Sequence, residues 1–203
     1  MGLEKGYYAD EGWPIMPLEV VEAVTEAAQS RGLRVTAHVT SMDELRLALD
    51  GGVNDLAHAP LEPIPEATIQ EMIEKGIGMA TTATVWGGPG ASAEAAANAK
   101  RYADAGGIVS IATDYGCCDQ APGLQPYLYE MEFLRGAGMT PMQLLVAATR
   151  NGAVLSNLAE NLGTIEAGKI ADIIVVNDNP LADIAALKDV AAVILEGRLV
   201  HER

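Results

Sequence analysis

Short apolar runs alternate with longer segments of helical periodicity along most of the chain. Leu18, Val21, Val24 and Ala28 recur at the spacing of one helix face, and Pro17 suits the first turn of that helix. The shorter runs between such segments are typical of strands. Alternation of strand and helix is the pattern of βα units, which build a parallel sheet, so the sequence predicts an α/β fold.

Capping residues and glycines bound the predicted elements. Ser41 with Glu44 and Thr140 with Gln143 form two capping boxes, and Gly32 suits the left-handed end of a helix. The predicted strands are residues 33–39, 53–57, 77–85 and 108–113. The predicted helices follow Pro17, Ser41 and Pro65, span residues 92–105 and 126–135, and start again at Pro141.

The pattern changes after Gly163. Two β-rich runs, residues 173–176 and 193–195, are accompanied by turns at Asp178-Asn179-Pro180 and Glu196-Gly197-Arg198. We therefore expect a small separate β element and place a boundary near Asn161, which divides the chain into residues 1–161 and 162–203.

The net charge and the composition of the chain disfavour some classes of binding partner. The 203 residues include 28 acidic and 13 basic side chains, a formal net charge of -15, which would repel a phosphate backbone and disfavours nucleic acid. No apolar run approaches the roughly 18 residues of a membrane span, and residues 1–10 show no signal pattern. The adjacent Cys117 and Cys118 are poorly placed for a disulfide. We expect a soluble, cytoplasmic protein that acts on a small molecule.

Three ionisable residues lie at the carboxyl ends of predicted parallel strands: His38, His58 and Asp114. Ligands and catalytic groups gather at the carboxyl ends of such strands. A single histidine there is more often a hydrogen-bonded core or loop residue than a ligand, but two at equivalent strand ends favour a metal site. Two imidazoles and one carboxylate suit Zn²⁺, with a water completing the coordination.

These strand ends resemble those of the amidohydrolase superfamily, in particular its imidazolonepropionase-like and prolidase-like members. The motifs that carry the resemblance are Thr36-Ala37-His38, Asp55-Leu56-Ala57-His58, Ala112-Thr113-Asp114, Ala148-Thr149-Arg150-Asn151-Gly152-Ala153, Gly163-Thr164-Ile165-Glu166-Ala167-Gly168-Lys169-Ile170-Ala171-Asp172-Ile173 and Asn179-Pro180-Leu181. The resemblance implies a partial TIM-type (β/α)8 barrel, strands five to eight with their helices, followed by the C-terminal arm of a small β-sandwich domain.

The resemblance also implies a chemistry and its residues. His38 and His58 would bind one metal ion, and Asp114 would ligate another and act as the catalytic proton acceptor. The implied reaction is hydrolysis of an amide or cyclic amide, in which a metal-activated water attacks the carbonyl, with one or two divalent ions such as Zn²⁺ as cofactor.

Loops after the strands are expected to shape substrate preference. Tyr7, Trp86 and Tyr115 are the predicted substrate-binding residues, and Thr40, Pro60 and Thr82 are further candidates in these loops. Each of the aromatic residues also suits a simple packing role.

The sequence departs from the family pattern in two places. The His-x-His pair of the first strand and the metal-bridging lysine of the fourth strand are both missing, and Lys5 resembles a loop residue beyond that lysine. Half a barrel would leave two open sheet edges, so we expect a homo-oligomer or a complementary chain with the N-terminal half-barrel. The alternative function is a catalytically inactive fragment or subunit. A Rossmann-like nucleotide binder is disfavoured because no Gly-x-Gly-x-x-Gly joins a strand to a helix.

Overall fold

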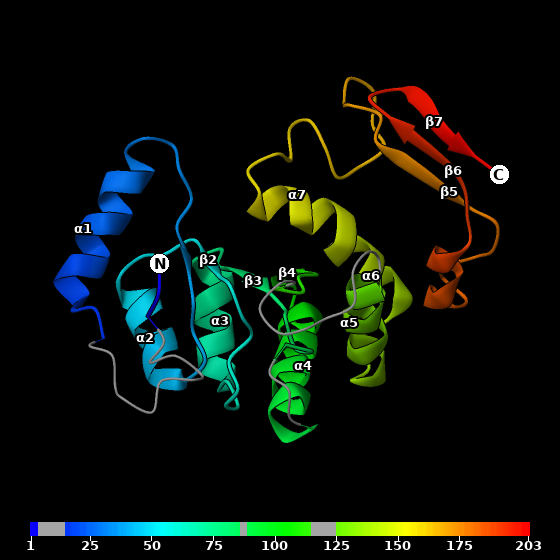
Figure 1. Cartoon of the computed structure of the whole chain (residues 1–203). Coiled ribbons are helices and arrows are strands. Elements are labelled where there is room, and N and C mark those ends of the chain that lie inside the picture. The colour runs from blue at the N-terminus through cyan, green and yellow to red at the C-terminus, as the bar shows by residue number, and fades with distance from the viewer. Residues whose placement is uncertain (4–14, 86–88, 115–124) are drawn as a thin grey trace.

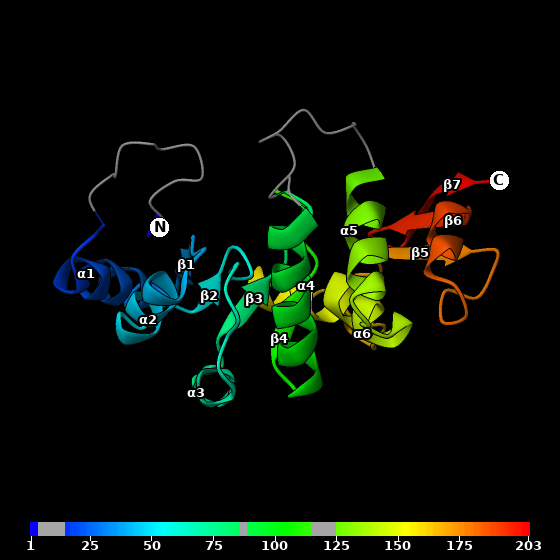
Figure 2. The ribbon, with the colours of Figure 1, turned by 90° about the horizontal axis from the view of Figure 1, so that it is seen from below.

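The computed structural model describes residues 1–3, 15–85, 89–114 and 125–203. It contains a four-stranded parallel sheet with its helices and a three-stranded antiparallel sheet (Figure 1). The first helix and the antiparallel sheet lie at opposite ends of the molecule, with the parallel sheet between them (Figure 2). The expected α/β fold with a parallel sheet is confirmed.

The elements follow one another in the order that the apolar pattern predicts for most of the chain. The helices are α1 (Leu18–Gln29), α2 (Met42–Asp50), α3 (Glu66–Glu74), α4 (Pro89–Asp104), α5 (Gln125–Gly136), α6 (Pro141–Val146) and α7 (Gly152–Leu155), with a π-helical turn at Ala147–Asn151 and a 3-10 helix at Ile184–Lys188. The strands are β1 (Thr36–Ala37), β2 (Asp55–Leu56), β3 (Gly78–Ala80), β4 (Ile108–Ser110), β5 (Ile173–Val176), β6 (Val190–Leu195) and β7 (Arg198–Glu202).

The parallel sheet has the strand order β1-β2-β3-β4, the same as the order in the sequence. The helices α2, α3 and α4 connect successive strands, and in Figure 1 all three lie on the same side of the sheet. Right-handed crossovers between parallel strands produce this one-sided arrangement when the strand order is sequential. All four strands therefore end at one edge of the sheet, where the residues that follow them come together.

The strands are shorter than the sequence predicts. β1 and β2 each contain two residues, where five to seven were expected from residues 33–39 and 53–57. Pairing continues beyond them only as single backbone bonds; for example, the Asp55 amide donates to the Val35 carbonyl at 3.1 Å. The extended segments are thus present, but only their centres form a regular ladder.

Each edge of the parallel sheet carries a short contact from elsewhere in this chain, and the expectation of two open edges stays a prediction. At the β1 edge, the Leu3 amide donates to the His38 carbonyl at 3.2 Å, and residues 1–3 run parallel to β1. At the β4 edge, the Asn151 side-chain amide donates to the Val109 carbonyl at 2.8 Å. Each edge is covered over only a short stretch.

Capping explains where the helices begin. Both expected capping boxes are present, Ser41 with Glu44 before α2 and Thr140 with Gln143 before α6. The side chain of α1 that packs most completely is Val21, which is fully buried, whereas the predicted core residues Leu18 and Val24 are exposed. Only part of the apolar face of α1 therefore has a covering element among the described residues.

The glycine-rich segment after α7 forms a tight loop. Gly163 has φ +91°, and a Cβ there would lie 2.6 Å from Ala153 Cβ, so only glycine fits. The Lys169 ammonium closes the loop by donating to the Ala159 carbonyl at 2.7 Å and to Thr164 Oγ1 at 2.6 Å. The positive φ of Gly163 and the hydrogen bonds of Lys169 explain why the motif of residues 163–173 has a glycine and a lysine at these positions.

The antiparallel sheet has the order β5-β6-β7. The turn at Glu196-Gly197 joins β6 to β7, and both residues have positive φ, +50° and +77°, as a tight two-residue hairpin requires. β7 was not predicted; it contains His201, which is exposed. The boundary near Asn161 remains a prediction.

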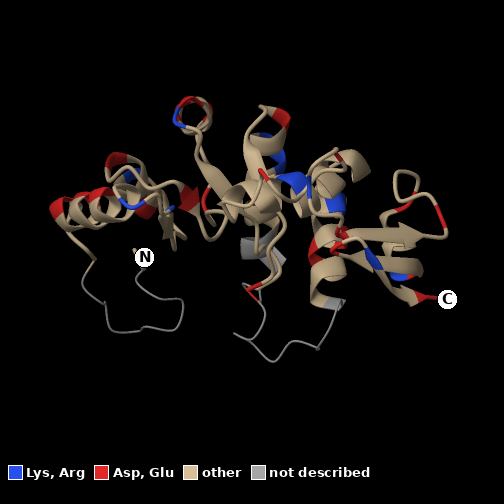
Figure 3. Cartoon of the chain, turned by 90° about the horizontal axis from the view of Figure 1, so that it is seen from above, with Lys and Arg blue, Asp and Glu red and all other residues tan. Residues whose placement is uncertain are grey.

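Acidic residues are spaced along α1, as the red segments of the ribbon in Figure 3 mark, and Glu19, Glu22 and Glu26 are all exposed. Within the described ranges, no helix combines the length and the apolar character needed to cross a membrane.

Candidate metal centre

His38 and His58 lie at the carboxyl ends of neighbouring parallel strands, β1 and β2. In the first of these segments Val35, Ala37 and Val39 are buried in the core. Because successive side chains of an extended segment point to opposite faces, His38 projects from the face opposite to these three residues.

The two imidazoles are in direct contact. His38 Nδ1 lies 2.7 Å from His58 Nε2, and the ring centroids are 4.8 Å apart with an interplanar angle of 52°. This is a hydrogen-bond distance, so one nitrogen donates and the other accepts. The structure thus brings together two of the three predicted metal ligands.

Burial keeps His58 neutral. The side chain is 3% exposed, and the pKa of His58 is lowered to about 4. Desolvation is the main cause; His38 also lowers this pKa, whereas the carboxylate of Asp114 acts in the opposite direction. A neutral imidazole with an available lone pair is the form that binds a metal ion.

Asp114 follows β4 and is exposed, with a φ of +49°. Its charge reaches His58, as the effect on the pKa of His58 shows. Among the residues that the structure describes, no group of three or more His, Cys, Asp or Glu side chains is close enough to hold a metal ion. The histidines form a pair, and Asp114 lies near the pair without completing a cluster.

A buried ion pair fixes the two histidine-bearing strands relative to each other. The Arg34 guanidinium donates to both carboxylate oxygens of Asp55, from Nε to Oδ2 at 2.9 Å and from Nη2 to Oδ1 at 2.6 Å. This hydrogen bonding raises the pKa of Arg34 above its ordinary value. Asp55, at the start of β2, is 1% exposed, and Gly78 on β3 leaves room for its carboxylate. Asp55 therefore has a structural role.

The loop after His58 is held by Asn98 of α4. The buried Asn98 amide donates to the carbonyls of Pro60 and Glu62, both at 2.8 Å, and its oxygen accepts from the Ile64 amide at 3.1 Å. The sequence interpretation overlooked Asn98, although a polar residue within an alanine-rich helix was a visible signal.

Thr82 and Glu130 also lie at this centre. Thr82, which the sequence interpretation named among the loop residues that shape substrate preference, has its Oγ1 2.7 Å from His58 Nδ1, on the side of the ring away from His38. Glu130, on α5, is fully buried and accepts hydrogen bonds from the turn that follows Thr82. The sequence interpretation did not identify Glu130, because its contact with that turn has no local signal.

Several predicted residues fall outside the described ranges. These are Tyr7, Trp86 and Tyr115, the three substrate-binding candidates, together with Lys5, Cys117 and Cys118. Thr40 is described, and both its amide and its hydroxyl donate to Glu44, which ties it to the start of α2.

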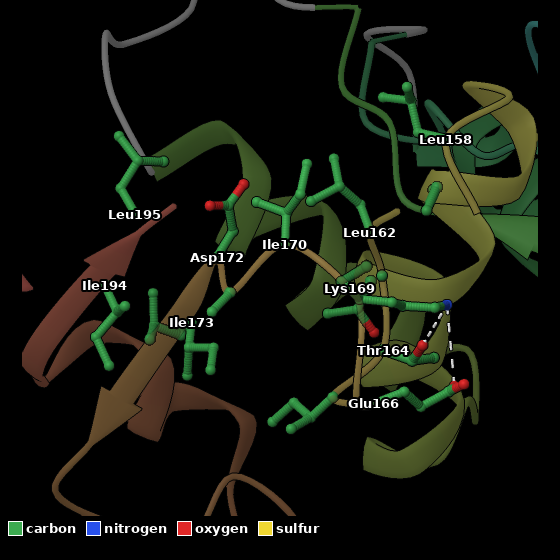
Figure 4. A pocket seen from close by; sticks show the side chains of 18 of the residues that line it. Leu158, Leu162, Thr164, Glu166, Lys169, Ile170, Asp172, Ile173, Ile194 and Leu195 are labelled. Atoms are coloured by element: carbon green, nitrogen blue, oxygen red, sulfur yellow. Dashed lines mark hydrogen bonds and ion pairs between the residues drawn. The ribbon is translucent and has the colours of Figure 1, made fainter. Parts of the chain in front are cut away.

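A cavity lies away from the histidines. It has a volume of about 850 Å³ and is formed by residues 148–174 and 193–195, which include neither histidine nor Asp114. Figure 4 shows Leu158, Leu162, Ile170, Ile173 and Ile194 around it, with Lys169 directed toward Thr164 and Glu166. Its lining is mainly apolar.

The donor chemistry of the pair fits a divalent ion such as Zn²⁺. Both facing nitrogens belong to imidazoles, which zinc prefers, and His58 is neutral at ordinary pH. Two nitrogen donors are fewer than the three protein ligands of a catalytic zinc site. Among the described residues, the pair alone therefore offers fewer donors than such a site needs.

The chain is similar in sequence to known proteins. The amidohydrolase family matches residues 2–200. Ochratoxinase of Aspergillus niger is 31% identical over 191 residues, covering 87% of this chain and 39% of ochratoxinase. Imidazolonepropionase of Alkaliphilus metalliredigens is 29% identical over 166 residues, covering 76% of this chain and 36% of that enzyme.

Solved structures show the same fold. A Xaa-Pro dipeptidase with bound methionine superposes with a TM-score of 0.83 at 25% identity, covering 100% of this chain and 53% of the dipeptidase. The ochratoxinase structure gives a TM-score of 0.83 at 24% identity, with coverages of 99% and 50%. The chain spans about two fifths of the curated relatives and about half of the solved ones.

Proposed function

Because the chain belongs to the amidohydrolase family, we propose that it forms part of a metal-dependent hydrolase of carbon–nitrogen bonds, of the amide or cyclic amide class. The observation that carries the proposal is the His38–His58 pair, with ring nitrogens 2.7 Å apart at the ends of adjacent parallel strands. Such strand ends are where catalytic groups of α/β enzymes gather.

Each candidate residue has a role in this proposal. His38 and His58 hold a divalent ion through ring nitrogens, and Asp114 lies near enough for its charge to act on His58. A zinc-type ion, when bound, supplies Lewis acidity that activates water and polarises a carbonyl. Asp114 accepts a proton from the attacking water and passes it to the leaving nitrogen. Tyr7, Trp86 and Tyr115 contact the substrate, which is a small molecule.

The proposed architecture is half of a (β/α)8 barrel. The four parallel strands correspond to strands five to eight, and β5, β6 and β7 form one arm of a β-sandwich. The sequential strand order with helices on one side supports this assignment, as does the coverage of about half of each solved relative. Strands one to four would then supply the remaining metal ligands.

We further propose that another polypeptide covers this half, either a second copy or a complementary N-terminal half-barrel. Large apolar side chains are exposed on and beside the antiparallel sheet: Ile165, Ile170, Ile174, Leu195, Leu199 and Val200. Large exposed apolar patches mark interaction sites. The cavity of Figure 4 is lined by four of these residues, Ile165, Ile170, Ile174 and Leu195, which supports a partner at this end of the molecule.

The activity is tested with a panel of Xaa-Pro dipeptides, N-acylated amino acids and a six-membered cyclic amide. Release of the free amine is followed with Zn²⁺, Mn²⁺ or Co²⁺, for the chain alone and for the chain co-expressed with the N-terminal half of the Xaa-Pro dipeptidase. We expect turnover that falls about 10²-fold or more in His38→Ala and Asp114→Asn. His201→Ala, which changes an exposed histidine on β7, is the matched control and keeps full turnover.

The alternative function is a catalytically inactive subunit, favoured by the absence of a third clustered ligand among the described residues. No turnover under any condition of the panel, together with a stable complex in light scattering, would support that alternative and refute the enzymatic proposal. A cytoplasmic location stays a prediction.

A further inference from the structure

A buried carboxylate that the proposed chemistry does not use lies directly behind the histidine pair. Glu130 of α5 is fully buried. Its Oε1 accepts from the Ala83 amide at 2.8 Å, and its Oε2 accepts from the Thr84 amide at 2.9 Å and from Thr84 Oγ1 at 2.7 Å. One side chain therefore fixes two consecutive amides of the turn after β3.

The residue just before those amides has an unfavourable backbone conformation. Thr82 has φ +49°, a region that β-branched residues rarely adopt, and its side chain is 2% exposed. Such a conformation persists only where neighbours impose it. The Ala112 carbonyl accepts from the Thr82 amide at 3.2 Å, and Glu130 holds the next two residues. The strained turn is thus held from both sides.

The strained turn places the Thr82 hydroxyl against His58. Thr82 Oγ1 lies 2.7 Å from His58 Nδ1, and the opposite nitrogen, Nε2, faces His38 Nδ1 at 2.7 Å. If Nδ1–H donates to Thr82, then Nε2 carries the lone pair that faces His38. The reverse arrangement would put a proton on Nε2 and block that nitrogen as a ligand.

We propose that Thr82, held by Glu130, is a positioning residue that keeps His58 in the Nδ1-protonated tautomer and so reserves Nε2 for metal binding. The proposal rests on the proposed function, because a reserved lone pair matters only for a ligand. A hydrogen bond to the second ring nitrogen fixes both the tautomer and the orientation of a ligating histidine, and its loss typically lowers metal affinity 10–100-fold.

The tautomer is measured without metal, by long-range ¹H–¹⁵N correlation spectra of ¹⁵N-histidine-labelled protein in EDTA near pH 7.5. His58→Gln and His38→Gln assign the signals. In the wild type we expect a protonated Nδ1 and an unprotonated Nε2 for His58. Thr82→Ser, which keeps the hydroxyl, retains that pattern; Thr82→Val, which has nearly the same shape without the hydroxyl, shifts it toward Nε2–H.

A protonated Nε2 in the wild type would overturn the proposal, as would a Thr82→Val spectrum identical to that of the wild type. Glu130→Gln tests the second part, since an amide places a donor against the two backbone amides. We expect this variant to shift His58 in the same direction as Thr82→Val, and an unchanged tautomer would remove Glu130 from the proposal.

Zinc affinity is the second readout, measured by competition with a chromophoric chelator. We expect a 10–100-fold loss in Thr82→Val and less than a threefold change in Thr82→Ser. A wild-type chain that binds no zinc but whose His58 tautomer depends on Thr82 would count against the metal function while supporting the positioning role. Failure of the metal function and failure of the positioning role therefore give different results.

Discussion

Replacing Arg34 with methionine tests how the histidine-bearing strands are held together. Arg34 donates two hydrogen bonds to Asp55, at 2.9 and 2.6 Å, and Asp55 pairs in register with Thr36 across β1 and β2. Methionine keeps much of the apolar stem but removes both donors. The substitution leaves a carboxylate that is 1% exposed without its cation.

The magnitude follows from the burial of the two partners. Removing one partner of a fully buried ion pair costs about 3–5 kcal/mol, because the remaining charge is left desolvated. The Arg34 side chain is 26% exposed, so water can reach one side of the carboxylate in the variant. Gly78 closes the opposite side, where even a Cβ would lie against Asp55 Oδ1. We therefore expect a loss of about 2–3 kcal/mol in the free energy of unfolding.

Urea denaturation followed by circular dichroism measures this loss. Arg46→Met is the matched control, since Arg46 bonds three oxygens of two carboxylates, Asp50 and Glu71, at 2.7 Å, but its side chain is 44% exposed. Exposed pairs contribute about 0–1 kcal/mol each. If Arg34→Met is no more destabilising than Arg46→Met, the ion pair does not hold β1 against β2. The double variant Arg34→Met/Asp55→Asn should recover part of the loss, because the buried charge is gone.

Three further predictions concern pH and backbone geometry. The lowered pKa of His58, about 4 against 6.5, means that the unfolded chain binds the proton first as pH falls. Stability of the metal-free protein should therefore fall by about 3 kcal/mol between pH 6.5 and 4, and His58→Gln should flatten this slope in urea titrations. Gly163→Ala places a Cβ 2.6 Å from Ala153 Cβ at positive φ, so we expect a loss of about 2 kcal/mol or more by thermal unfolding, and an unchanged melting temperature would contradict it. Gly78→Ala should be comparably destabilising by the same measurement, because its Cβ would displace the Asp55 carboxylate.

The order of elements could be predicted from the sequence because local signals mark it. Both capping boxes, with Ser41 and Thr140 as the capping residues, begin helices as expected. The parallel pairing could also be predicted, since the helix after each strand returns the chain to the edge of the sheet where that strand began, and the next strand then runs in the same direction. The strand lengths could not be predicted from the sequence, because the apolar pattern marks extended segments and does not reveal where the hydrogen-bond ladder stops.

The candidate site likewise has a part that the sequence predicts and a part that it does not. The position of His38 and His58 at strand ends was visible in the sequence. The contact between their rings was not, because the register that pairs Ala37 with Leu56 does not place the two histidines opposite each other. The role of Glu130 was not visible, because it depends on α5 packing against a turn 46 and 47 residues earlier in the chain. Long-range polar contacts of this kind carry no local signature.

The most direct test of the central claim is a calorimetric titration of Zn²⁺ into the metal-free chain. If His38 and His58 form part of a metal site, zinc should bind to the wild type and to His201→Ala, and this binding should disappear in both His38→Ala and His58→Ala. Zinc binding that is equally strong in all four proteins, or absent from the wild type at millimolar zinc, would contradict the claim.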